Sequence, residues 1–209
     1  MAAPTILRVS LALALAVIAC GGCDDADSVV PPAIHDPGEP WQAAPFAIDP
    51  AIIAAAEQTC RDPRMGMMPK AGIPLVLADA RGGNYLYLKF AAGGDEAECF
   101  VQRDANGTLT NQGGGSSSGG NAQPALAPTE IQLGGSGSQS SGNAPGQTQS
   151  FASGRAGGAV MAIEIVLSNG RSIQASLNGG WFAAWWPSAD SASRAAGYDG
   201  SGTLVGTWP

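Results

Sequence analysis

The sequence predicts a mostly β protein, an antiparallel β-sandwich that carries one α-helix near its N-terminus and a long Gly/Ser-rich insertion. Two stretches, residues 73–103 and 161–186, alternate apolar residues with polar or small ones, which is the period of a half-buried strand. Short turn sequences with Gly, Asn and Asp separate the alternating runs, so neighbouring strands are expected to pair antiparallel. In residues 49–63, before the first of these stretches, apolar residues recur at intervals of three and four, as on one face of a helix.

The helix is predicted to begin after Asp49 and to end before Pro63. Asp49 is a favourable N-cap residue, and Pro50 suits the first helical position because its missing N–H would have no partner within the helix. One face of the helix collects the apolar residues Ile52, Ile53, Ala56 and Cys60. Cys60 is therefore expected to point inward, where a cysteine on a strand can meet it.

An antiparallel meander is expected after the helix. Its three strands are predicted at about 74–79, 84–91 and 97–103, with turns at 81–84 and 93–96. Asp104-Ala105-Asn106-Gly107 is typical of a further hairpin turn.

Residues 111–150 are low in complexity, with ten Gly and eight Ser. Glu130 is the one charged residue between Asp104 and Arg155. Little apolar surface is available there to offset the entropy of ordering, so we expect a flexible insertion with one possible strand at 129–133. A long surface loop is tolerated because its closure cost grows only logarithmically with length.

The C-terminal part predicts a hairpin whose register follows from its apolar rows. Met161, Ile163, Ile165 and Leu167 share one strand face, and Ile173, Ala175 and Leu177 share the next, all at odd-numbered positions. A three-residue loop, 168–170, pairs Ile165 with Ile173 and Met161 with Leu177, and it places Gly170 in the left-handed conformation of a bulged turn. A two-residue loop would set polar residues against the apolar row.

Trp181 to Trp186 is predicted to form the next strand, and a last strand is expected around 203–208. Alternation sends Trp181 and Trp185 to one face and Phe182 and Trp186 to the other. We favour burial of both faces, but one face left uncovered would be an apolar patch for sugar rings or a partner protein. The possible binding surface therefore consists of Trp181, Phe182, Trp185 and Trp186.

The domain organisation follows from composition. Residues 1–19 are interpreted as a signal peptide, 20–44 as a proline-rich tether and 45–209 as a single sandwich domain. The 59 residues from 151 to 209 would be marginal as a unit of their own, so one sandwich domain, with each of the two alternating stretches supplying one sheet, is the simpler solution.

The N-terminus combines a positive start at Arg8 with the apolar run 11–18, which is too short to span a membrane as a helix. The run ends in Val17-Ile18-Ala19-Cys20, which resembles the lipobox of bacterial lipoproteins. The resemblance implies cleavage before Cys20 and a diacylglycerol on its thiol, and so an exported protein anchored in the cell membrane or the outer membrane. The alternative is an ordinary signal peptide and a secreted protein with a free Cys20 thiol.

The remaining cysteines are Cys23, Cys60 and Cys99. In an oxidising compartment disulfides persist, and we pair Cys60 with Cys99 because both lie in segments with folded-domain patterning. Cys23 is then left over in the tether. No metal or other cofactor is expected, since the single histidine, His35, lies among prolines.

The net charge and the absence of catalytic motifs limit the classes of function that the sequence supports. With 10 Lys and Arg against 17 Asp and Glu, the chain carries a net charge of −7, which argues against nucleic acid as a partner. His35 lies in the tether, so a histidine-based triad is not expected, and the chain is interpreted as non-enzymatic. The leading hypothesis is a lipid-anchored envelope protein with a structural or protein-binding role. The alternatives are a carbohydrate-binding module that uses the 181–186 strand, and a hydrolase that uses carboxylates such as Asp79 and Asp104.

The C-terminal residues carry a second, unspecific resemblance. The 181–186 strand, the hairpin before it and Tyr198-Asp199-x-x-Gly202 are similar to the endings of uncharacterised secreted bacterial proteins. This resemblance implies no activity.

Overall fold

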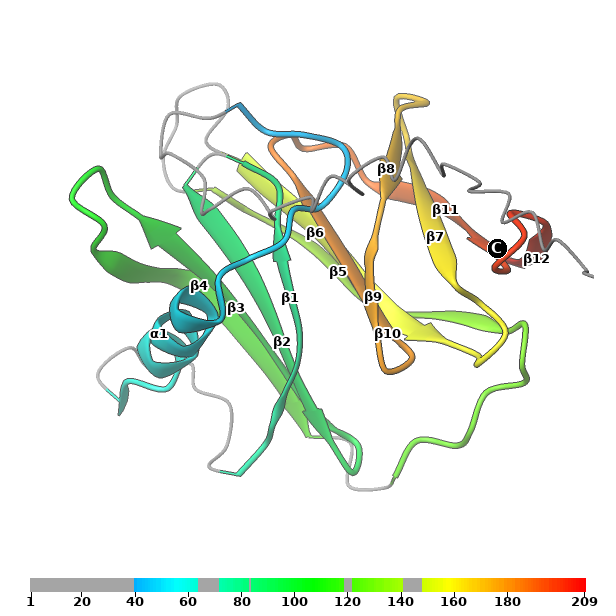
Figure 1. Ribbon diagram of the computed structural model, residues 1–209, viewed down its shortest axis with the longest axis horizontal. Helices are drawn as coiled ribbons and strands as arrows, with labels where there is room; N and C mark the ends of the chain where they lie inside the picture. Colours follow the sequence, from blue (N-terminus) through cyan, green and yellow to red (C-terminus); the bar gives the residue numbers. More distant parts are fainter. Residues whose placement is uncertain (1–39, 64–71, 83, 119–121, 141–147) are drawn as a thin grey trace, which may run out of the picture. The chain divides into compact units, whose positions relative to one another are not determined.

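The computed structural model describes residues 40–63, 72–82, 84–118, 122–140 and 148–209. Within these ranges the protein is mostly β and its sheets are antiparallel, as predicted (Figure 1). The elements, in chain order, are α1 (Pro50–Cys60), β1 (Leu75–Ala80), β2 (Tyr85–Ala92), β3 (Asp95–Arg103), β4 (Leu109–Ser118), β5 (Ile131–Ser140), β6 (Thr148–Ala156), β7 (Ala162–Leu167), β8 (Ser172–Gln174), β9 (Ser176–Asn178), β10 (Trp181–Trp186), β11 (Ala192–Tyr198) and β12 (Leu204–Trp208).

The strands form three four-stranded sheets. The first sheet has the order β1-β2-β3-β4, the middle sheet β5-β6-β10-β9 and the third sheet β12-β11-β7-β8. The expectation that each alternating stretch supplies one sheet is wrong for residues 161–186, because this part of the chain divides between two sheets at Ala175. Ala175 still donates its N–H to the carbonyl of Ile163 in the third sheet, and the next residue, Ser176, pairs with Ala183 in the middle sheet. A strand that switches sheets in this way makes the corner between two packed layers.

The described residues form three apolar clusters, one between helix α1 and the first sheet and two between neighbouring sheets. Helix α1 covers the outer face of the first sheet, and Ala56 and Leu88 belong to the cluster between them. A second cluster, between the first and middle sheets, includes Tyr87 and Trp185. Phe182 and Trp186 belong to the largest cluster, between the middle and third sheets. The alternation of strand side chains places Leu88 and Tyr87 on opposite faces of β2, which explains how one strand serves two cores.

Helix α1 confirms the predicted boundaries. The Asp49 carboxylate accepts a hydrogen bond from the N–H of Ala51 at 2.7 Å, and Pro50 is the first helical residue. Cys60, the last residue of the helix, is fully buried and forms a disulfide with Cys99 in β3, so the predicted pairing is confirmed. The bridge fastens the helix to the first sheet.

The predicted hairpin register is confirmed near its turn and wrong at its far end. Ile165 pairs with Ile173, and Gly170 has a φ of 81°, which is the left-handed conformation expected of it. Leu177, however, pairs with Phe182 in the middle sheet and not with Met161. Met161 is 64% exposed, just before β7 begins, and does not belong to the apolar row.

The expectation of a flexible Gly/Ser-rich insertion is wrong for most of the described residues in it. Residues 109–118 and 131–140 form the ten-residue strands β4 and β5, and β6 begins at Thr148. Backbone ladders order these strands where apolar burial could not: β4 pairs with β3 along its whole length, and β5 pairs with β6. Residues 119–121 and 141–147 lie outside the described residues.

Glycine has a steric role in these paired strands. A Cβ on Gly114 would lie 2.1 Å from the carbonyl oxygen of Glu98, and one on Gly154 would lie 2.2 Å from that of Gln132. Strand segments that approach this closely leave no room for a side chain. The low-complexity composition therefore permits the packing of β3 against β4 and of β5 against β6.

Candidate functional site

The aromatic strand β10 lies inside the middle sheet, between β6 and β9. Phe182, Trp185 and Trp186 are each at most 2% exposed, because the first sheet covers one face of β10 and the third sheet covers the other. The alternative of an exposed apolar patch is therefore wrong for Phe182, Trp185 and Trp186, and the favoured expectation, burial of both faces, is confirmed for these residues.

Trp181 differs from the other aromatic residues of β10. It is the first residue of the strand and is half-buried, because it lies where the middle sheet ends. It lines a cavity of about 410 Å³ with residues of the β2–β3 turn, of segment 122–126, of the end of β6 and of the β9–β10 turn. Of the four predicted surface residues, Trp181 lines this cavity.

Two further cavities adjoin this one. A cavity of about 340 Å³ shares Gly94, Glu96, Gln123, Arg155 and Trp181 with the first. A third, of about 220 Å³, shares Glu96 with both and reaches Lys89 and Glu98. We call these three cavities the Trp181 cleft. Its volume falls in the range of small-ligand sites.

A buried lysine supplies the inner wall of the cleft. Lys89 Nζ lies 2.6 Å from Glu96 Oε2 and 2.8 Å from Glu98 Oε1, and the lysine side chain is only 2% exposed. The Ser153 hydroxyl donates to the same Glu98 oxygen at 2.8 Å. Two carboxylates within hydrogen-bond distance compensate for the desolvation of the ammonium group, so this interior charge is tolerated.

The outer wall of the cleft is polar and more accessible. Arg155 Nη1 donates to Gln123 Oε1 at 3.0 Å and to the carbonyl of Pro124 at 2.9 Å, and the Gln123 amide donates in turn to Glu96. The Arg155 guanidinium lies 5.8 Å from the centre of the Trp181 ring, and Lys89 Nζ lies 5.9 Å from it. These contacts orient the indole.

Sequence reasoning missed the charged residues of the cleft. Lys89 shares with Tyr85 and Tyr87 the face of β2 that meets the middle sheet. A lysine in the otherwise apolar strand YLYLKFAA was the available signal of a buried ion pair. Arg155 and Gln123 gave no such signal, because only the packing of segment 122–126 brings them together.

Tyr87 is a buried phenol next to this cluster. Its hydroxyl has no hydrogen-bond partner within the described part of the chain. Burial, and next the negative charge of Glu98, raise the pKa of Tyr87 well above its usual value. The folded protein therefore holds the phenolic proton at a pH where the unfolded chain releases it.

The raised pKa predicts a loss of stability in alkali. Above about pH 10 the unfolded chain ionises Tyr87 and the folded state does not, so the free energy of unfolding falls by up to about 1.4 kcal/mol per pH unit. Tyr87→Phe should remove this contribution and leave stability at neutral pH unchanged or higher, because the buried hydroxyl is unpartnered. Urea titrations between about pH 9 and pH 11 measure it, with Tyr85→Phe in the same strand as the matched control. An equal alkaline slope for Tyr87→Phe and the unsubstituted chain would contradict the assignment.

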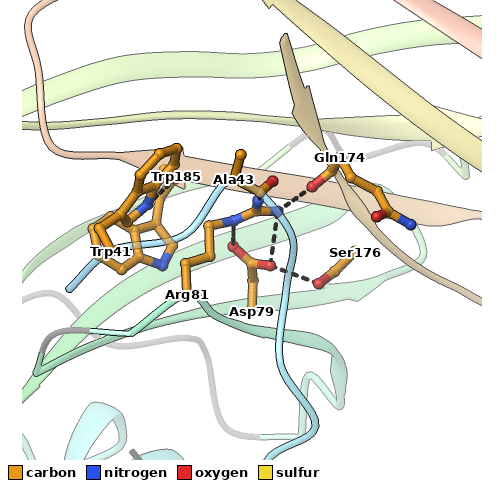
Figure 2. A network of polar contacts seen from close by, with 7 residues as sticks. All are labelled: Trp41, Ala43, Asp79, Arg81, Gln174, Ser176 and Trp185. Atoms are coloured by element: carbon orange, nitrogen blue, oxygen red, sulfur yellow. Dashed lines mark hydrogen bonds and ion pairs between the residues drawn. The ribbon is translucent and has the colours of Figure 1, made fainter. Parts of the chain in front are cut away.

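A second buried ion pair lies at the end of β1, an edge strand of the first sheet (Figure 2). Arg81 Nε lies 2.7 Å from Asp79 Oδ2, and both side chains are fully buried. Arg81 also donates to the carbonyls of Ala43 and Gln174, and the Ser176 hydroxyl donates to Asp79 Oδ1 at 2.6 Å. Burial raises the pKa of the Asp79 carboxyl, whereas Arg81 and Ser176 act in the opposite direction.

This ion pair joins four segments of the chain. Asp79 and Arg81 lie at the end of β1, Ala43 precedes α1, Gln174 ends β8 and Ser176 begins β9. Backbone bonds reinforce it, since Gln42 donates to the carbonyl of Arg81 at 2.6 Å and Gln174 to that of Ala43 at 3.0 Å. The indole N–H of Trp41 donates to the carbonyl of Trp185. Residues 41–43, which lie in the predicted tether, are therefore bound to the folded domain.

The carboxylates proposed for a hydrolase have other roles in the structure. Asp79 is fully buried against Arg81, which excludes it from an open cleft. Asp104 accepts hydrogen bonds from the N–H groups of Asn106 and Thr108 at 2.9 and 2.8 Å, and so closes the predicted hairpin turn. The two residues thus do not supply an accessible catalytic pair.

Several predicted residues lie outside the described residues. They are Cys20, Cys23 and His35. Across the described residues, no three His, Cys, Asp or Glu side chains are grouped so that they could hold a metal ion. Nor does the described chain contain a helix of the length and apolar character that a membrane crossing requires.

Comparison of the chain with protein-family models, with curated proteins and with solved structures finds no match.

Proposed function

We propose that this protein is a lipid-anchored, non-enzymatic component of a bacterial cell envelope whose folded domain has a structural or binding role. The observation that carries the proposal is the sequence Val17-Ile18-Ala19-Cys20 behind a short apolar run. Two or three acyl chains at Cys20 would hold the protein firmly, because each buried CH₂ contributes about 0.8 kcal/mol. The Cys60–Cys99 disulfide supports an exported location, since such bridges persist in oxidising compartments.

A binding or structural role draws support from how the interior charges are used. Asp79 is paired with Arg81, and Lys89 is held between Glu96 and Glu98. A serine hydroxyl of the middle sheet donates to each of these clusters, Ser153 to Glu98 and Ser176 to Asp79, and so joins it to the neighbouring sheet. A domain fixed by two buried ion pairs and a disulfide suits the presentation of a rigid surface at the end of a tether.

Fractionation of cells that express the full chain tests the anchor. We expect the unsubstituted protein in the membrane fraction and the Cys20→Ser variant in the soluble fraction, because a serine hydroxyl does not accept the lipid. Cys23→Ser is the matched control, three residues away, and it should stay with the membrane. Equal partitioning of the Cys20→Ser variant and the unsubstituted chain would show that Cys20 does not anchor the protein, and release of both into the medium would favour a secreted protein.

A further inference from the structure

We infer that the Trp181 cleft binds a neutral glycan chain, with a sugar ring stacked on the indole of Trp181. The inference rests on the binding role proposed above and names its site and ligand class. It does not depend on the lipid at Cys20, because the cleft lies entirely within the folded domain.

The first argument is the contrast between Trp181 and its surroundings. Around the half-buried indole, the 410 Å³ cavity is lined largely by alanine and glycine, among them Gly93, Gly94, Gly179 and Gly180 of the two adjoining turns. Small residues leave room for a ligand and expose backbone N–H and C=O groups to it. An aromatic ring carries a negative face, which attracts the weakly positive C–H groups on the apolar face of a pyranose ring.

The second argument is the set of polar groups beside the indole. Glu96, Gln123 and Arg155 line both of the larger cavities. Each ends in a planar group with two or more hydrogen-bonding atoms, a geometry that fits adjacent hydroxyl groups of a sugar. Because these three side chains also bond to each other, they are already oriented before a ligand arrives.

The third argument is charge. Among the described residues, those that line the cleft include two cations, Lys89 and Arg155, and the carboxylates Asp95, Glu96 and Glu98, so positive charge is not in excess there. Lys89 is already bonded to Glu96 and Glu98. A sulfated or uronic ligand would meet these carboxylates, whereas a neutral ligand incurs no such repulsion.

The fourth argument concerns ligand length. The cavities of about 410 and 340 Å³ share Trp181, Glu96 and Arg155, so Trp181 lies where two subsites meet. Such an arrangement fits a chain of at least two sugar units that passes across the indole. A single small metabolite would occupy one cavity and leave the other empty.

The test is a titration of the full chain with sugars, and the chain carries Cys20→Ser so that no membrane is needed. The neutral probes are the trisaccharides chitotriose, cellotriose and maltotriose. The charged probe is trigalacturonic acid. Nitrogen-15 NMR follows the indole N–H of Trp181 and the side-chain amide of Gln123. We expect at least one neutral trisaccharide to shift both signals saturably and the charged probe to bind more weakly. No saturable shift with any neutral probe, or tighter binding of the charged one, would overturn the inference.

Variants separate stacking from a general effect on the fold. Trp181→Ala should weaken binding at least about tenfold, and Trp181→Phe should retain part of it, because a smaller ring still stacks. Gln123→Ala removes an exposed side chain. We expect it to keep the fold and to weaken binding several-fold. Trp208→Ala in the third sheet is the matched control and should bind as the unsubstituted chain does. Unchanged affinity in both Trp181→Ala and Gln123→Ala would place the sugar elsewhere.

The two proposals fail in distinguishable ways. If Cys20 is not the anchor, the Cys20→Ser variant fractionates as the unsubstituted chain does. The NMR titration is unaffected by that outcome, because the titrated chain already lacks the Cys20 thiol. If the cleft binds no glycan, the titration is flat while the protein still fractionates with membranes.

Discussion

Replacement of both Cys60 and Cys99 by alanine is expected to lower the free energy of unfolding by about 4 kcal/mol. The bridge joins residues 39 apart in the sequence, so in the oxidised unfolded chain it closes a long loop and removes conformational entropy. It also fastens α1 to β3. Without it, the contact of the helix with the first sheet depends on apolar packing by residues such as Ala56.

Urea titration of the full chain measures this difference. Cys23→Ala serves as the control for loss of a thiol and should not change stability measurably, since the pairing leaves Cys23 outside the bridge. A loss below about 1 kcal/mol for the double alanine variant would mean that the bridge contributes little, against the entropic account.

Arg81→Met is expected to lower the free energy of unfolding by about 3–5 kcal/mol. The substitution preserves much of the side-chain volume but leaves the Asp79 carboxylate fully buried without its partner. It also removes the donors to the carbonyls of Ala43 and Gln174, and so loosens the chain segment that leads into the domain. Arg171→Met, at an exposed arginine near Trp41, is the control and should cost little.

A double variant separates the loss of a partner from the net contribution of the ion pair. Asp79→Leu together with Arg81→Met removes both charges, and we expect it to recover much of the stability that Arg81→Met loses. Urea titrations of both variants and of Asp79→Leu alone complete the cycle. If the double variant is no more stable than Arg81→Met, the cost arises from lost packing and carbonyl partners, and not from an unpaired Asp79.

Much of the fold could be predicted where local chemistry determines it. The cap at Asp49, the first three strands and the pairing of Ile165 with Ile173 all follow from residue types and spacing that tertiary packing does not override. The three-residue loop 168–170 sets the register that pairs Ile165 with Ile173. This register is strongly constrained, because a shift by one residue would turn every apolar side chain of a strand to the wrong face.

Other elements could not be predicted because their signals are tertiary. Strands β4 and β5 consist largely of Gly, Ser and Gln, which have low strand propensity, and their order comes from pairing with β3 and β6. Strand β11, with the sequence ASRAAGY, was missed for the same reason and is set by pairing with β7 and β12. The switch of the chain between sheets at Ala175 likewise has no signature in the local sequence.

The candidate site, too, could be predicted from the sequence only in part. The sequence marked the aromatic strand as unusual, but it could not show that two sheets cover Phe182, Trp185 and Trp186 while Trp181 remains half-buried. Exposure at one position of a strand depends on where the neighbouring layers end. Residues from different segments, such as Gln123 and Arg155, meet only in the folded chain.

Mass spectrometry of the N-terminal peptide from protein extracted from native membranes tests the central claim most directly. The account predicts a mature chain that begins at Cys20 and carries two or three acyl chains. An unmodified thiol at Cys20, or a mature chain that begins at another residue, would contradict it.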